Sequence, residues 1–208
     1  CILLFIFASI VTLFPQFFTK LIAYGFAPSE IELAAPYVAI NFWYLPLIFI
    51  TTFFATILQY KSRFAALSFF PALLNVGMIV ALALSFDSTP QDVVLNLSLG
   101  VIGGGILQVL FVLYFSSNHG VLKMISVGRR SANKNKERSK SDLNRFYKQF
   151  LPSLLGSSTA QIASFIDTLL ASFLVSGAIS YLYYANRIIK LRLAKFALAL
   201  SAALFPIT

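Results

Sequence analysis

The sequence is poor in the residues that build disulfides, metal sites and charged surfaces. Its 208 residues include one cysteine, Cys1, and one histidine, His119, which excludes a disulfide framework and an ordinary Cys/His metal site within the chain. Charged residues make up only 11%, against about 25% in a typical soluble domain. Hydrophobic residues make up 59%, and the mean hydropathy is +0.84. These values exclude a soluble globular domain and predict a membrane protein.

Long apolar runs divide the chain into membrane-spanning segments. A spanning helix needs about 20 mostly apolar residues, and six such segments predict an all-α polytopic membrane protein with about six transmembrane helices. The segments are Cys1–Phe18, Pro36–Leu58, Ala65–Phe86, Val93–Ser116, Phe150–Leu174 and Ile179–Phe205. The chain has no initiator Met, and its first residue already lies within an apolar run. We therefore expect an internal piece of a longer polytopic protein.

The charges of the connections alternate along the chain. The connection Thr19–Ala35 carries one lysine against two glutamates. The connection between the third and fourth spans carries only two aspartates, Asp87 and Asp92. In contrast, residues 59–64 carry two basic residues, and residues 117–148 carry nine against two acidic ones. Because short cytoplasmic loops are enriched in Lys and Arg, we expect loops 59–64 and 117–148 to be cytoplasmic and the other connections to lie outside.

The long basic connection has two parts. Gly120–Val127 is weakly amphipathic and is expected at the membrane interface. Gly128–Ser141 is polar with few apolar residues, which predicts disorder. Its positive charge is explained either by attraction to anionic lipid head groups or simply by a positive-inside anchor. No aromatic residues are interleaved in the basic run, so no nucleic-acid partner is expected.

The interiors of the predicted spans contain glycines and isolated polar residues. Gly100 and Gly103–Gly105 lie in the fourth span, where small residues favour close helix packing; bending of the helix during transport is a second explanation. Asn75 and Gln108 are expected to form hydrogen bonds between helices rather than to bind a ligand.

Charged residues lie within the last two spans, and the first of them in each span are Asp167 and Arg187. Such groups cost about 2.5–3.5 kcal/mol each at membrane depth and usually face a cavity or pathway. In the sixth span, the spacing of Ser180, Tyr183 and Arg187 places them on one helix face, with Asn186 beside it. Arg187 offers a planar set of donors that suits phosphate. Together with Asp167 in the fifth span, this pattern predicts a hydrated cavity, cationic on the Arg187 side, for an anionic substrate.

A buried ion pair between Asp167 and Arg187 would explain the same two charges without any substrate. However, Lys190, Arg192 and Lys195 follow in the same span with no acidic partners there. Helix packing does not account for so many unpaired cations, although some can snorkel to the head groups. The cationic cavity is therefore the sharper hypothesis.

Three stretches of the sequence resemble a known family. They read SFFPALLNVGMIVALAL, then GVIGGGILQVLF, then LPSLLGSSTAQIASFIDTLLASFLVSGAISYLYYANRI. In this order they resemble the MurJ lipid II flippases (MviN/MurJ family) of the MOP transporter superfamily. The resemblance implies a fourteen-helix protein with two lobes around a central cavity, of which this chain supplies helices three to eight. Residues 1–116 would end the N-lobe with four spans, 117–148 would be the cytoplasmic linker, and 149–208 would begin the C-lobe with two.

The resemblance also implies roles for particular residues. Arg187 matches a cavity arginine that binds the pyrophosphate of lipid II, and Ser180, Tyr183 and Asn186 would line the same cavity. Asp167 falls where some members place a carboxylate of a sodium site, whose other ligands lie in later helices. The sequence departs from the family's pattern at Asn186, where Asp is common, and in the cations that follow Arg187.

The function implied is movement of lipid-linked peptidoglycan precursor to the outer leaflet of the bacterial inner membrane by alternating access. No bond is made or broken, so no enzyme activity and no cofactor are expected. The driving force would be the membrane potential or an ion gradient, with Na+ as a coupling ion. The partners would be lipid II, membrane lipids and the remaining helices of the full protein, and the piece alone should not transport.

Three other functions are open. The nearest is another MOP-type exporter, for polysaccharide-lipids or drugs, although a drug-cation exporter should have acidic cavity walls. An integral-membrane enzyme would need a polar catalytic cluster at the interface, and the sequence has none. A helix scaffold predicts that Arg187→Ala causes no selective transport defect.

Overall fold

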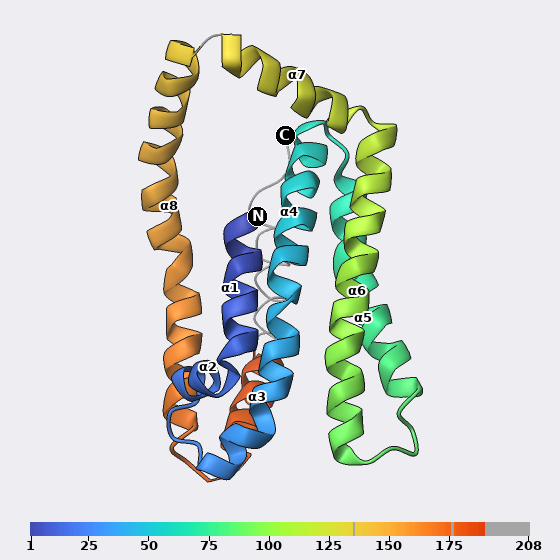
Figure 1. Ribbon diagram of the computed structural model, residues 1–208, viewed down its shortest axis with the longest axis vertical. Helices are drawn as coiled ribbons and strands as arrows, with labels where there is room; N and C mark the ends of the chain where they lie inside the picture. The colour runs from blue at the N-terminus through green and yellow to red at the C-terminus, as the bar shows by residue number, and fades with distance from the viewer. Residues whose placement is uncertain (135, 176, 190–208) are drawn as a thin grey trace, which may run out of the picture.

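The computed structural model describes residues 1–134, 136–175 and 177–189, and all secondary structure in these ranges is helical. The predicted cations Lys190, Arg192 and Lys195, with the rest of the sixth predicted span, lie outside the described residues. Eight helices have defined bounds, and a further helix covers residues 178–189 (Figure 1). The eight are α1 (Ile2–Leu13), α2 (Pro15–Ile22), α3 (Pro28–Phe42), α4 (Tyr44–Tyr60), α5 (Phe64–Ala83), α6 (Pro90–Asn118), α7 (Val121–Lys134) and α8 (Lys136–Ala171).

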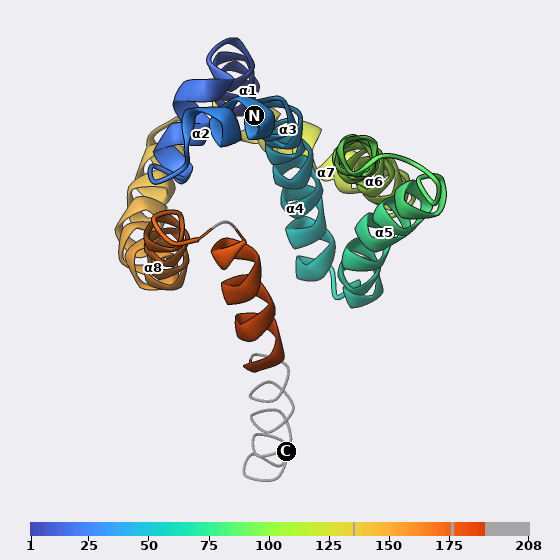
Figure 2. The ribbon, with the colours of Figure 1, turned by 90° about the horizontal axis from the view of Figure 1, so that it is seen from below.

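The long helices run roughly side by side, and α7 crosses one end of them from α6 to α8 (Figure 1). Seen along the long axis, they form an arc that begins with α8, passes through α1–α3 and α4, and ends with α6 and α5 (Figure 2). The helix of residues 178–189 lies on the concave side of this arc. α8 is thus separated from α5 and α6 by the middle of the arc (Figure 2).

The lengths and apolar composition of the helices identify an integral membrane protein. The stretches Pro28–Tyr60 and Pro90–Asn118 are each long and apolar enough to cross a membrane, and α1 with α2 would count as a third span if taken together. The described part of α5 adds a shorter apolar helix, Phe69–Ala83. The larger count of about six spans stays a prediction.

The first predicted span, Cys1–Phe18, is not one continuous helix. The chain bends by 97° between α1 and α2, and α2 begins at Pro15. Proline has no backbone N–H and its ring clashes with the preceding turn, so a helix cannot continue straight through it. The expectation of an unbroken first span was therefore wrong.

The helix of the second predicted span, α3, begins earlier than expected. Residues 19–35 were predicted as a connection, but α2 continues to Ile22 and α3 begins at Pro28. The backbone N–H of Ala27 donates a hydrogen bond to the Glu30 carboxylate at 3.0 Å. Pro in the first turn and an acidic side chain beside the N-terminal dipole both favour a helix start. The acidic residues read as a loop signal are instead part of a helix N-terminus.

The predicted disorder of residues 128–141 was also wrong. α7 continues to Lys134 and α8 begins at Lys136, so the basic stretch is helical on both sides of residue 135. Low apolar content does predict the absence of a core there, but Lys, Arg, Glu and Ala are good helix formers. In addition, α8 continues without a break into the fifth predicted span. Its polar N-terminal part therefore extends a helix that the apolar part already forms.

Close packing, the first explanation for the glycines, is confirmed between α5 and α6. A Cβ atom added at Gly77 would lie 2.6 Å from the Gly100 carbonyl oxygen, and one added at Gly100 would lie 2.6 Å from Ala81 Cβ. Gly104 is similarly close to the α5 backbone. Gly103 is different, because a Cβ there would meet nothing within 4 Å. Three of these glycines therefore allow the two backbones to approach, and the fourth does not take part.

The two isolated polar residues behave differently. Gln108 is 2% exposed; its Nε2 donates to the Phe70 carbonyl at 2.6 Å, and its Oε1 accepts from the Tyr44 hydroxyl at 3.1 Å. It thereby joins α6 to both α4 and α5, as predicted. Asn75 is exposed, and its side chain has no hydrogen-bond partner among the described residues, so the expectation for Asn75 stays a prediction.

The connections gather at the two ends of the helices. At one end, Lys61 Nζ donates to the His119 carbonyl at 2.8 Å, so the turn after α4 contacts the corner between α6 and α7. Gly120 at this corner has φ +69°, a conformation that favours glycine. At the other end, the Tyr37 hydroxyl donates to the Gln91 carbonyl at 3.3 Å, close to the connection between α5 and α6. Figure 1 shows the same division.

Candidate functional site

The helix that carries most of the predicted site begins directly after a glycine turn. Gly177 has φ +91°, which an L side chain rarely adopts. The Tyr181 N–H then donates to the Gly177 carbonyl at 3.0 Å, the first of the helical hydrogen bonds. The break between the last two predicted spans is therefore confirmed at Gly177, and residues 178–189 form the helix that was expected there.

The four predicted substrate-binding residues all lie on this helix. Ser180 and Arg187 are exposed, Tyr183 is 64% exposed, and Asn186 is half-buried. Helical spacing puts Ser180, Tyr183 and Arg187 on one face. The helix lies on the concave side of the arc (Figure 2). Their polar groups are thus open to a ligand, whereas Gln108 in the bundle is enclosed.

The predicted ion-site residue, Asp167, is exposed near the end of α8. Beside it, Thr168 Oγ1 donates a hydrogen bond to the Ser164 carbonyl at 2.9 Å rather than to the carboxylate. In the described ranges no group of three or more Asp, Glu, His or Cys residues is placed to hold a metal ion. Among the described residues, Asp167 thus belongs to no such group.

The alternative of a buried Asp167–Arg187 ion pair was wrong. Both side chains are exposed, and no nitrogen of Arg187 lies within 4.0 Å of a carboxylate oxygen of Asp167. A charge pair that only holds helices together should be desolvated and in contact, because an exposed pair contributes little. The charge of Arg187 is consequently available to an anion.

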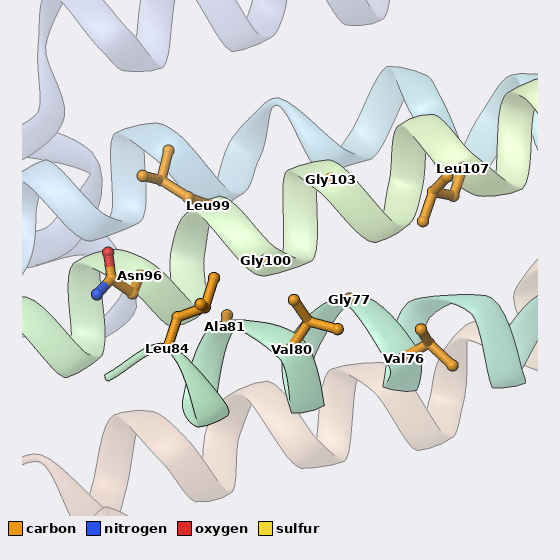
Figure 3. A pocket seen from close by; sticks show the side chains of 10 residues that line it. All are labelled: Val76, Gly77, Val80, Ala81, Leu84, Asn96, Leu99, Gly100, Gly103 and Leu107. Atoms are coloured by element: carbon orange, nitrogen blue, oxygen red, sulfur yellow. The ribbon is translucent and has the colours of Figure 1, made fainter. Parts of the chain in front are cut away.

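Sequence reasoning missed an apolar groove between α5 and α6 (Figure 3). Its volume is about 490 Å³, and it is lined by aliphatic side chains such as Val80 and Leu107. Asn96 lies at one end, where its Nδ2 donates to Ser85 Oγ at 2.8 Å. The groove opens beside Gly103, where an added Cβ atom would meet nothing within 4 Å, whereas Gly100 and Gly104 contact α5. The sequence does not distinguish these glycines, so it does not predict the groove.

A second hollow lies in the elbow between α1, α2 and α3. It has a volume of about 590 Å³ and is lined by Phe14, Gln16, Glu32 and apolar neighbours. Hydropathy does not indicate this hollow, because it depends on the bend at Pro15. Neither hollow includes Arg187 or the residues predicted to bind with it.

Comparison with known proteins gives a consistent result. The sequence model of the family described as "Lipid II flippase MurJ" matches residues 1–207. A protein of Helicobacter pylori named "Probable lipid II flippase MurJ" is 51% identical over 99% of this chain and 46% of its own length. Proteins of the same name from Haemophilus influenzae and Aquifex aeolicus are 33% and 31% identical over 85% and 94% of this chain, and 33% and 37% of their own lengths. The chain thus spans less than half the length of these curated relatives, and it belongs to the family of the lipid II flippase MurJ.

Proposed function

We propose that the intact protein containing this chain is a lipid II flippase. It moves lipid-linked peptidoglycan precursor from the cytoplasmic to the outer leaflet of the bacterial inner membrane by alternating access. Family membership supports this activity, and the observation that carries it to particular residues is the open position of Arg187. An exposed guanidinium, carried by a helix on the concave side of the arc and out of contact with the Asp167 carboxylate, suits a negatively charged head group.

In this proposal Arg187 binds the pyrophosphate of lipid II. Its planar donors can form two parallel hydrogen bonds to phosphate oxygens, which a lysine cannot. Ser180 and Tyr183 share the helix face and offer hydroxyl groups to the same head group, and Asn186 borders it. The chain holds and releases the substrate, and no bond in it is made or broken, so the protein is not an enzyme.

The proposed orientation places the basic connections in the cytoplasm. Loops 59–64 and 117–148 carry the positive charge, and the Lys61–His119 contact supports the requirement that both lie at one end. The connections 23–27 and 84–89 lie at the opposite end, near the Tyr37–Gln91 contact, and would face outward. Six spans, arranged as part of an N-lobe, a basic linker and the start of a C-lobe, remain part of this proposal.

Resetting a cationic cavity after it releases an anionic lipid requires energy. Each charge moved through the membrane potential supplies about 2.3 kcal/mol per 100 mV, so the potential or an ion gradient suffices as a driving force. We propose that Asp167 contributes one ligand to a Na+ site that other parts of the protein complete. No step of substrate binding by Arg187 depends on that ion.

The test is complementation by the full-length parent in cells depleted of their own lipid II flippase. We expect the wild type to restore growth and Arg187→Ala to lose at least tenfold in viable count at equal membrane abundance. Arg187→Lys should be intermediate, because it keeps the charge without the planar fork. Arg145→Ala is the matched control, since Arg145 is also an exposed arginine, lies on α8 outside the site, and should behave as wild type.

The outcomes separate the rival functions. Failure of an abundant wild type to complement would contradict the flippase and favour another exporter of the same superfamily. Full activity of Arg187→Ala would leave the family's activity intact but remove Arg187 from substrate binding.

A further inference from the structure

The end of α8 makes a close contact with the turn between α2 and α3. The Gly25 N–H donates a hydrogen bond to Ser172 Oγ at 2.9 Å, across 147 positions of sequence. The same hydroxyl donates to the Leu169 carbonyl at 2.6 Å. Ser172 is 4% exposed. The hydroxyl is therefore both buried and fully used, as a structural contact requires.

The contact leaves no space for a side chain at position 25. A Cβ atom there would lie 2.5 Å from the Ser172 carbonyl oxygen and 2.6 Å from the Phe173 nitrogen. Beside it, the rings of Tyr24 and Phe173 lie 6.2 Å apart. Two backbones thus meet directly, with an aromatic pair at their edge.

This contact lies beside the only packing, in the part of the chain that the structure describes, between α8 and the helices before α7. Among α1–α8, α8 contacts only α7, its neighbour in sequence, and α2. α7 joins α8 at one end and α2 meets it at the other (Figure 1). The part of the chain before residue 119 is therefore held to α8 by a covalent connection at one end and by the Gly25–Ser172 contact at the other.

We propose that the Gly25–Ser172 contact is a latch that closes the outer end of the transport pathway and must open once in each cycle. This inference rests on the proposed function and adds the contact that limits access from outside. The covalent end cannot separate, so a relative movement of the two parts pivots at α7 and opens at the latch. One hydrogen bond and one aromatic pair form a contact small enough to break and re-form repeatedly.

The first test locks the latch. A cysteine-free full-length parent receives Tyr24→Cys and Phe173→Cys, and a short bifunctional methanethiosulfonate reagent bridges them. We expect lipid II transport to fall at least tenfold on bridging and to return when a reductant removes the bridge. The control pair, Asn41→Cys with Ser98→Cys, links α3 to α6, whose side chains are 2.9 Å apart. Bridging this pair should change transport less than twofold. Transport that continues with Tyr24 and Phe173 positions bridged would overturn the latch.

The second test opens the latch and needs no transport. A Ser180→Cys reporter in the same parent is labelled from outside with a membrane-impermeant maleimide. Gly25→Ala, which wedges the contact, should raise the labelling rate severalfold, and Ser172→Ala, which removes only the hydrogen bond, should raise it less. Unchanged labelling in both folded variants would overturn the proposal. If the wild-type parent fails to complement, the proposed function fails, while this labelling result still decides the latch.

Discussion

The two parts of the chain on either side of α7 are packed in different ways. In α6, six residues are buried, including Gln108 with both of its polar groups bonded across the bundle. Among the side chains of α8 that the structure describes, only Ala171 at its end is buried. The first part is held together by buried contacts between its own helices. The second part presents polar residues on open faces, which is what binding and movement require.

The largest loss of stability is expected at the glycines where α5 and α6 pack closely. Gly100→Ala should destabilise the full-length parent by about 1–3 kcal/mol, because overpacking a close contact has that cost, and the new Cβ would lie 2.6 Å from Ala81 Cβ. The melting temperature of the purified protein and its membrane abundance measure this.

Gly103→Ala is the matched control, because it lies on the same helix with nothing within 4 Å. It should be neutral or slightly stabilising, since Ala is the better helix former. Equal losses for the two variants would contradict the packing account of α5 and α6.

A smaller effect is expected at the buried polar contact. Gln108→Leu should destabilise the parent by about 1 kcal/mol, the usual scale of a hydrogen bond between membrane helices, because the Tyr44 hydroxyl and the Phe70 carbonyl lose their partner. Asn75→Leu, at an exposed polar position in the neighbouring helix, serves as the comparison and should change the melting temperature little. If Asn75→Leu proves the more damaging, the division between enclosed and open polar residues is wrong.

The smallest change in stability is expected in the open part of the chain. Asp167→Asn should alter the free energy of unfolding by less than about 0.5 kcal/mol, as is usual for exposed positions. If Asp167 contributes to a Na+ site, transport by this variant should lose its response to external Na+, measured by exchanging Na+ for K+ at constant ionic strength. An unchanged Na+ response would remove Asp167 from ion coupling.

Local patterns in the sequence predicted much of this arrangement. The alternation of loop charges assigned loops 59–64 and 117–148 to the same side, and the Lys61–His119 contact brings one residue of each loop together. Helical spacing placed Ser180, Tyr183 and Arg187 on one helix, because that relation depends only on neighbours in sequence. The glycine contacts between α5 and α6 followed from the preference of small residues for helix interfaces.

The features that were missed depend on distant residues or on competing local signals. Pro15 lies inside an apolar run, and a prediction from hydropathy alone does not detect the bend that it causes. The basic residues 128–141 are poor in apolar side chains but rich in helix formers, and the helix signal prevailed. The Gly25–Ser172 contact could not be predicted, because nothing near Gly25 in the sequence indicates a partner 147 positions away.

The central claim is that the intact protein moves lipid II across a bilayer with Arg187 in its path. The most direct measurement uses vesicles containing the purified full-length parent and fluorescent lipid II, with an impermeant quencher reporting the fraction in the accessible leaflet. The account predicts translocation well above that of protein-free vesicles, reduced at least tenfold by Arg187→Ala and unaffected by Arg145→Ala. Translocation no faster than in protein-free vesicles, by wild-type protein that is folded and correctly inserted, would contradict it.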